Sequence, residues 1–275
     1  MKKLLVAAAA GLTLSVGGMA GAADLGRPIM KAPPPPPPPI YSWTGCYVGA
    51  GGGYGMYNRT HDLEIGPGFI GAGTVIVGNE DAGGRGWLAT VQVGCDFQIA
   101  QSIVIGAFAD YDWRNIRGQY TLAGLPVVGE LRERNAWAAG GRIGWLVNPQ
   151  LLSYVSAGYT QVRTDTTNFA LNIPLIGLGG LVLANLPGQT LDGWFIGGGV
   201  EYALGWFPGL FWKTEYRFAD YRRNDDLRTI FIGTTAVPSI FAERSHHYDQ
   251  TIRTELVWRF NMFGGGYGGP VRAAY

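Results

Sequence analysis

The sequence contains few of the residues on which catalytic and metal sites depend. Cysteine occurs twice and histidine three times in 275 residues. His246 and His247 are adjacent, so they cannot both face one metal ion on a regular strand, and His61 stands alone. Ser245 precedes this pair without a convincing acidic partner for a catalytic triad. We therefore predict no enzyme activity, no metal site and no cofactor, and we expect the histidines to lie at the surface.

Charged residues are also scarce, and their signs are balanced. They make up 15% of the chain, with 21 Lys and Arg against 20 Asp and Glu. A nucleic-acid partner requires a basic surface, so this near neutrality argues against one. After residue 43 no segment has helical periodicity or the length of a membrane-spanning helix. These absences favour an all-β fold.

The first residues indicate export. Lys2 and Lys3 precede an apolar stretch, and Ala20-Gly21-Ala22 closes it with the small residues that signal peptidase accepts. The alternative, an N-terminal membrane anchor, needs a longer apolar run. The predicted organisation is a cleaved signal peptide over 1–22, a proline-rich periplasmic linker over 23–40, a barrel over 41–260 and a glycine-rich tail over 261–275.

The linker contains an unbroken run of prolines from 33 to 39. Proline at every position imposes polyproline II geometry, which makes this run a stiff spacer of roughly 20 Å. We interpret it as an inert tether. The alternative is a recognition segment that contacts peptidoglycan or another periplasmic partner.

Eight segments after the linker have the length and alternation of β-strands, and very short and very long connections join them in turn. This pattern predicts an eight-stranded antiparallel transmembrane up-and-down β-barrel with short periplasmic turns and long extracellular loops. The predicted short turns are 99–102, 148–151 and 207–209. The predicted strands are 43–57, 85–98, 103–115, 134–147, 152–163, 191–206, 210–221 and 247–260.

The tryptophans fall at two levels along these strands, and all except Trp43 share the apolar parity of their strand. Indole rings favour the headgroup zone of a membrane, so two rings of tryptophan indicate a lipid-facing band. The core of a soluble barrel has no reason to sort tryptophans in this way. The predicted girdles are Trp87, Trp113, Trp137 and Trp194 at the long-loop end, and Trp145, Trp206, Trp212 and Trp258 at the short-turn end.

The opposite parity of the strands is charged, and it must then face the barrel interior. Eight strands enclose a space that side chains can fill, and isolated charges in a narrow dry lumen are costly. We therefore expect a plug of structural ion pairs, with an ion gate as the less favoured alternative. The predicted network is Asp96, Asp110, Asp112, Arg114, Arg142, Glu201, Lys213, Glu215, Arg217, Arg253 and Glu255.

The two cysteines fall on neighbouring predicted strands. If Met56 pairs with Arg85 across the first long loop, residues whose numbers sum to about 141 lie opposite each other, and Cys46 and Cys95 satisfy that sum. The periplasm is oxidising, so a disulfide is one interpretation. A register slip of two residues would abolish it, and two small buried hydrophobic residues are the alternative.

Several strands resemble a known family. Segments 43–49, 199–203, 213–221 and 247–260 are similar to the small OmpA-like outer-membrane proteins of alphaproteobacteria, and the resemblance covers about residues 41–260. It implies a barrel embedded in outer-membrane lipid and lipopolysaccharide and inserted by the barrel-assembly machinery, with Phe260 as the assembly signal. The tail after Phe260 departs from most of the family, and so does Cys46, where phenylalanine is commoner.

The predicted loops include three unusually apolar segments, 66–78, 171–186 and 229–241. We expect them to form hairpin extensions that pack together above the membrane, and the alternative is a hydrophobic patch for a ligand, a protein or lipid. The favoured function is a structural barrel that supports the envelope and forms at most a narrow or gated pore. The alternative is a binding or adhesion protein that uses these loops, with a lipid-modifying enzyme as a distant third.

Overall fold

A computed structural model of the chain describes residues 43–121, 127–173, 178–232 and 235–260. In this part of the chain no helix has the length and apolar character that crossing a bilayer requires. The predicted signal peptide, linker and tail lie outside the described residues. The elements are β1 (Gly45–Ile65), β2 (Val75–Gln98), β3 (Ile103–Thr121), β4 (Val127–Asn148), β5 (Leu151–Thr164), β6 (Thr167–Ile173), β7 (Leu178–Leu186), β8 (Thr190–Ala203), β9 (Leu210–Ile232) and β10 (Thr235–Phe260).

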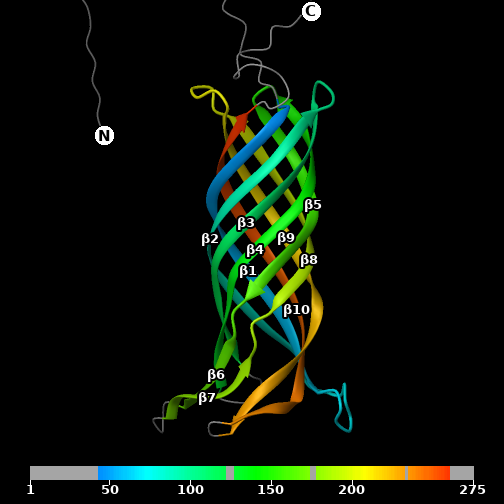
Figure 1. The fold of residues 1–275 in the computed structure, drawn as a ribbon, viewed down its shortest axis with the longest axis vertical. Helices are drawn as coiled ribbons and strands as arrows, with labels where there is room; N and C mark the ends of the chain where they lie inside the picture. The colour runs from blue at the N-terminus through cyan, green and yellow to red at the C-terminus, as the bar shows by residue number, and fades with distance from the viewer. Residues whose placement is uncertain (1–42, 122–126, 174–177, 233–234, 261–275) are drawn as a thin grey trace, which may run out of the picture. The chain divides into compact units, whose positions relative to one another are not determined.

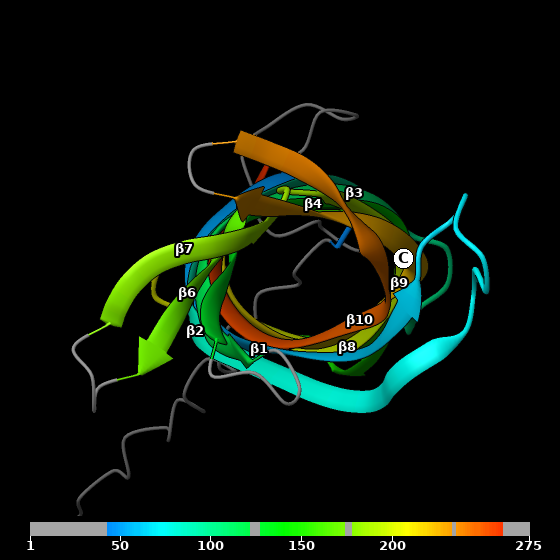
Figure 2. The ribbon, with the colours of Figure 1, turned by 90° about the horizontal axis from the view of Figure 1, so that it is seen from below.

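Eight of these strands form a closed antiparallel ring. The order is β1-β2-β3-β4-β5-β8-β9-β10, and β10 pairs with β1 from Cys46↔Phe260 to Ile65↔Phe241 to close it. Figure 2 looks along the ring from the long-loop end and shows the strands enclosing a central space. The predicted eight-stranded antiparallel barrel is therefore confirmed. Closure leaves the ring without an unpaired edge, which a strand inside lipid cannot tolerate.

The two faces of the ring follow the alternation in the sequence. Successive strand residues point to opposite sides, and along β5 buried and exposed residues alternate almost without interruption. The outer wall carries the apolar residues, and the charged parity is buried inside. All eight girdle tryptophans lie on the outer surface, with 40–77% of each side chain exposed.

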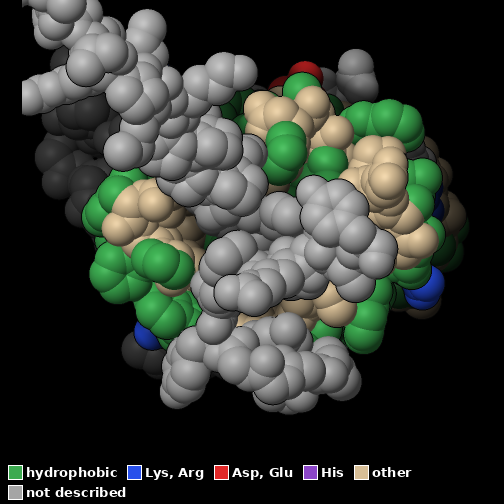
Figure 3. Space-filling view, turned by 90° about the horizontal axis from the view of Figure 1, so that it is seen from above, with side chains coloured by type: hydrophobic (Ala, Val, Ile, Leu, Met, Phe, Trp, Pro, Cys, Tyr) green, Lys and Arg blue, Asp and Glu red, His purple; other side chains and the backbone are tan. Residues whose placement is uncertain are grey.

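The strands turn tightly at one end of the ring. Figure 3 looks onto this short-turn end, where hydrophobic side chains dominate the rim. The turn after β8 begins earlier than predicted, because Leu204 N donates to Leu210 O and Phe207 N donates to Leu204 O. Trp206 therefore lies in the turn rather than at the end of a strand. Gly209 completes this turn with φ +84°, a backbone conformation that favours glycine.

The strands continue well past their predicted ends on the other side of the ring (Figure 1). Segments 58–84, 116–133, 164–190 and 222–246 were predicted as loops. In three of them the same neighbours keep pairing, for example His61↔Ser245, whereas 164–190 forms the separate hairpin β6–β7. The prediction stopped the strands too early because it equated strand length with membrane thickness. β-branched and aromatic residues in these segments sustain the ladder beyond it.

The hairpin β6–β7 joins the extensions of two ring strands. Val127↔Leu171 ties it to β4, and Ala184↔Ile230 ties it to β9, so that it passes over the ends of β5 and β8. The segment between β1 and β2 instead lies on the opposite side of the barrel (Figures 1 and 2). The expectation that all three apolar segments pack together is therefore wrong for this tip.

Backbone hydrogen bonds fold the tip between β1 and β2. Ile65 N donates to Thr74 O, and Gly73 N donates to Ile65 O. Glycines with positive φ at 68, 71 and 73 fold it tightly. The side chain of Ile70 is fully exposed as a result.

Candidate functional site

The charged interior of the ring is the chemically distinctive part of the molecule. Each predicted lumen residue is at most 6% exposed, because alternation directs one parity of every strand inward. The structure brings all of them together in one continuous set of contacts. They divide into a lower cluster near the short turns, a middle cluster and an upper cluster near the long loops. Here the long-loop end is taken as the top, which is the reverse of the view in Figure 1.

The lower cluster pairs two arginines with two carboxylates. Arg142 Nη1 lies 3.1 Å from Glu201 Oε2, and its other nitrogens bind Asp96. Arg259 Nη2 lies 2.6 Å from Asp96 Oδ2 and 2.7 Å from Glu201 Oε1. The ring of Tyr47 lies 4.7 and 5.0 Å from the two guanidinium carbons. Every charge in this cluster therefore has an opposite partner, and both guanidinium groups also lie against an aromatic ring.

Trp43 closes the interior below this cluster. It is completely buried, its Nε1 donates to Pro149 O at 3.2 Å, and its ring lies 5.0 Å from the guanidinium carbon of Arg259. Its ring also packs against Phe211, with centroids 5.0 Å apart. This explains why Trp43 alone among the tryptophans departs from the outward parity.

The middle cluster crosses the ring. Arg217 of β9 binds Asp110 of β3 through Nη2 and Oδ2 at 2.8 Å and Glu215 at 2.7 Å. Lys213 donates to Gln92 Oε1 at 2.5 Å and lies 3.3 Å from Glu255 Oε1. The contacts of Arg217 with Asp110 and of Lys213 with Gln92 join strands that share no backbone hydrogen bonds, so the cluster fills the width of the lumen.

The upper cluster is centred on Arg114. Its Nη1 lies 2.6 Å from Asp249 Oδ2 and 3.1 Å from Glu133 Oε2, and its Nη2 lies 3.1 Å from Asp112 Oδ2. Arg253 reaches the same Asp112 at 3.3 Å, which links the upper cluster to the middle one. The charged side chains therefore form a column along the lumen.

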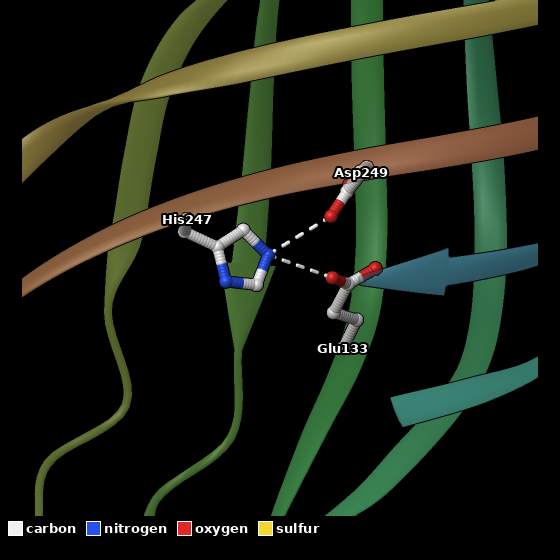
Figure 4. Close-up of side chains that lie close together, drawn as sticks. All are labelled: Glu133, His247 and Asp249. Carbon is white, nitrogen blue, oxygen red and sulfur yellow. Dashed lines mark hydrogen bonds and ion pairs between the residues drawn. The ribbon is translucent and has the colours of Figure 1, made fainter. Parts of the chain in front are cut away.

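His247 sits between two carboxylates at the top of this column (Figure 4). Its Nε2 lies 2.9 Å from Glu133 Oε1 and 2.9 Å from Asp249 Oδ1. The expectation of surface histidines is therefore wrong for His247, which is 1% exposed, and for His61, which is also buried. His247 shares the inward parity of β10. His246 has the outward parity and lies 2.7 Å from Asp220 Oδ1.

Ligand atoms of Glu133, His247 and Asp249 lie within 4.8 Å of one another, a spacing that could hold a metal ion. The carboxylate oxygens that do not face His247 are already bound by Arg114. A divalent cation would therefore sit beside a fixed positive charge, whereas a protonated imidazole balances the two carboxylates together with Arg114. The geometry fits the proton better than the metal.

The protonation of His247 has a clear electrostatic cause. In the strand register, Tyr248 of β10 and Trp194 of β8 both lie opposite Asp220 of β9. His247 is one residue nearer the long loops than Tyr248, so it stands outside the apolar band. Burial by itself lowers the pKa of His247, but the negative charge of Asp249 and hydrogen bonds to Asp249 and Glu133 raise that pKa to about 9. The imidazole is therefore a cation at neutral pH.

Sequence reasoning missed several members of the column. Glu133 lies one residue before the predicted strand 134–147, and a register shift between Glu133 and Asn135 turns it inward against the parity of that strand. Asp249 and Arg259 were assigned to the charged parity of the last strand but were left out of the network. Extending the alternation of that strand to its first residue would have found His247 as well.

The remaining predicted sites are the two cysteines and Phe260. Cys46 faces Cys95 in the β1–β2 register, and a disulfide joins their sulfurs. Phe260 is the last residue of β10 and pairs with Cys46 where the ring closes. Its role as an assembly signal stays a prediction.

No family model matches the chain. The chain is 25% identical over 267 residues to the 31 kDa outer-membrane immunogenic protein of Brucella melitensis, a match that covers 94% of this chain and 100% of that protein, and the Brucella suis protein of the same description gives the same values. The solved structure of outer membrane protein OprG from Pseudomonas aeruginosa matches with 13% identity and a TM-score of 0.49, over 79% of this chain and 97% of that one. Ail, the attachment invasion locus protein of Yersinia pestis, matches with 9% identity and a TM-score of 0.36, over 78% and 99%.

The closed ring, its exposed apolar band and the outer-membrane relatives together identify a small β-barrel embedded in the outer membrane of a Gram-negative bacterium. The narrower resemblance to OmpA-like proteins stays a prediction. The described interior presents a column of ion pairs, and these pairs hold opposite walls of the barrel together.

Proposed function

We propose that this protein is a structural barrel that supports the outer membrane and conducts solutes poorly or not at all. The observation that carries the proposal is the contact of Arg217 with Asp110, from strands on opposite sides of the ring. A side-chain pair that spans the lumen leaves no open path beside it in a ring of eight strands.

The clusters above and below reinforce this obstruction. Arg142 and Arg259 fill the lower lumen, and His247 reaches Glu133 across the upper lumen at 2.9 Å. Opening a gate would separate these buried pairs, and breaking a buried pair by removing one partner typically costs about 3 to 5 kcal/mol. Several such pairs in series favour a permanent plug over a gate.

Planar bilayer recordings of the purified full-length chain test this function. The wild-type chain is expected to give no steady conductance, whereas Arg217→Ala with Asp110→Ala is expected to admit small ions, because it removes the bridge across the lumen. The matched control is Arg134→Ala with Asp165→Ala, a solvent-accessible pair outside the lumen at 3.4 Å, which should leave the recordings unchanged. A steady open-pore conductance from the wild-type chain would refute a plugged barrel.

The proposal also assigns the interactions of the barrel with the envelope. Phe260 ends the strand that closes the ring, so the barrel-assembly machinery would read it during insertion, and the wall would contact outer-membrane lipid and lipopolysaccharide. The proline linker would contact peptidoglycan or remain a tether. Removing residues 33–39 should therefore leave membrane insertion intact, and cell fractionation measures this.

A second candidate function is binding or adhesion through the long-loop end. The observation that favours it is the β1–β2 tip, where Phe69, Ile70, Val75 and Ile76 are all exposed. Retention of cells on alkyl-coated beads tests it: Phe69→Ser with Ile70→Ser should lower retention, and Val182→Ser on another hairpin is the matched control. Equal retention of all three strains would count against this function.

A further inference from the structure

Three arginines occupy directly opposite positions on three adjacent strands of the outer wall. Arg85 of β2 faces Arg117 of β3, and Arg117 in turn faces Arg132 of β4. Arg85 and Arg117 are exposed, and Arg132 is half-buried. We call these three residues the arginine row. Neighbouring strands are about 5 Å apart, so the three Cα positions span about 10 Å.

The arginine row lies just beyond the outer tryptophan girdle. Arg85 is two positions nearer the long loops than Trp87, and Arg117 is four positions nearer the long loops than Trp113. Arg132 is five positions from Trp137 in the same direction. With about 3.3 Å per residue and a tilt near 40°, the row is roughly 5 to 13 Å above the indole rings. Indole rings mark the headgroup zone, so the row stands at the level of lipid phosphates.

The charges of the row are poorly compensated within the described residues. Like charges directly opposite each other on neighbouring strands destabilise a sheet. Arg117 Nη1 lies 3.6 Å from Glu130, which is 59% exposed, so this pair contributes little. In the part of the chain that the structure describes, neither Arg85 nor Arg132 has an ion-pair partner, and Nε of Arg132 is buried without a hydrogen-bond acceptor.

The rest of the barrel makes this row an exception. Arg134 on the same rim is paired with Asp165, and near the short turns Arg142 and Arg259 point inward. The lumen arginines that contact carboxylates are Arg114, Arg142, Arg217, Arg253 and Arg259. Among the described residues, outward arginines lie directly opposite one another only at the rim that faces the leaflet at the long-loop end. Arg163 is exposed at the same rim, but its neighbours across the strands are Asn135 and Thr190.

We propose that the arginine row binds the phosphate groups of a lipid headgroup in that leaflet. Guanidinium groups bind phosphate through paired hydrogen bonds, and one phosphate between two adjacent arginines would relieve their mutual repulsion. The length of the row accommodates two phosphates. The apolar wall with Trp87 and Trp113 continues directly below, so the acyl chains of the same lipid would pack against it. This continuity favours a lipid over a soluble anion.

Native mass spectrometry of the full-length chain in detergent tests the site. The probes are bisphosphorylated lipid A, the same glycolipid without phosphates, and inorganic phosphate. The wild-type chain is expected to retain the bisphosphorylated lipid at least tenfold more tightly than the dephosphorylated one. Arg85→Gln, Arg117→Gln and Arg132→Gln combined should remove this preference. Inorganic phosphate at millimolar concentration should neither bind nor displace the lipid.

The matched control is Arg134→Gln, a neighbouring exposed arginine on β4 that already pairs with Asp165. It should retain the lipid within twofold of wild type. Slower migration after boiling identifies the folded barrel in every variant, so a loss of binding is measured on folded protein only. Equal retention by the triple variant and the wild type would overturn the proposal, and so would equal loss in the control. Binding of inorganic phosphate alone would assign the row to a soluble anion instead. None of these outcomes depends on whether the lumen conducts.

Discussion

Arg217 on β9 and Asp110 on β3 are joined across the full width of the barrel, with 2.8 Å between Nη2 and Oδ2. The two strands are four steps apart in either direction around the ring, so no backbone hydrogen bond connects them. The pair therefore couples opposite walls that the β-ladder links only indirectly. His247 and Glu133 make a second contact of this kind higher in the lumen.

The coupling between Arg217 and Asp110 is measurable by a double-mutant cycle. Arg217→Met should lower the free energy of unfolding by about 3 kcal/mol, because it leaves buried carboxylates without their partner. Asp110→Asn in the same chain should recover more than 1 kcal/mol of that loss. Urea unfolding of the barrel in lipid vesicles provides the values. Strictly additive effects of the two substitutions would show that the contact contributes nothing as a pair.

Glycines on the inward face of β1 let β10 approach closely. A Cβ on Gly51 would lie 2.0 Å from Thr254 O and 2.7 Å from Glu255 Cα, too close for any rotamer change to relieve. Gly51→Ala should therefore prevent ring closure and abolish the mobility shift of the folded barrel on boiling. Gly52→Ala is the control, because its Cβ would meet only Leu88 O at 3.2 Å. It should keep the shift, and identical behaviour of the two variants would contradict this explanation.

Alternation, together with the short and long connections, was sufficient to predict the ring and the direction of most side chains within the predicted strands. Period-2 patterning is a local property, so the strict parities of 247–260 and the outward tryptophans were visible in the sequence. The partners of each lumen charge were not, because they depend on strand tilt and stagger. The contact of Arg217 with Asp110 joins residues 107 positions apart in the chain. Nothing local to either residue indicates the other.

The long-loop end was the least predictable part. Membrane thickness limits a spanning strand but places no limit on pairing in water, so β1 continues to Ile65 and β10 begins at Thr235. His247 was missed because it is the first residue of its predicted strand, and Glu133 was missed because a register shift next to Asn135 reverses the parity there. The arginine row was missed likewise, because register alone shows that Arg85, Arg117 and Arg132 are neighbours.

The disulfide joins Cys46 to Cys95, which are 49 positions apart in the chain. Intact mass after alkylation should show no adduct without reduction and two adducts after it. Cys46→Ser with Cys95→Ser should lower the free energy of unfolding by at most about 4 kcal/mol, the chain-entropy value for a loop of this length. β1 and β2 remain hydrogen-bonded without the bond, so the barrel should still form. Two adducts on the unreduced protein would show that the cysteines are free.

His247 should make the stability of the barrel depend on pH. Its pKa is about 9 in the folded protein, against 6.5 in an unfolded chain. A raised pKa means that folding favours the protonated form, so its stabilisation is complete below pH 6.5 and is lost as the pH rises through 9. The size of this effect is on the order of 3 kcal/mol.

The measurement is the difference in unfolding free energy between the wild type and His247→Gln, taken at pH 6 and at pH 10. Other groups titrate in both proteins, so only the difference reports on His247. It should shrink by about 3 kcal/mol between the two pH values, because the neutral imidazole no longer balances Glu133 and Asp249. Adding zinc or a chelator at pH 6 should change neither protein, since Arg114 already binds both carboxylates. A difference that is constant with pH but falls on chelation would replace the proton with a metal ion.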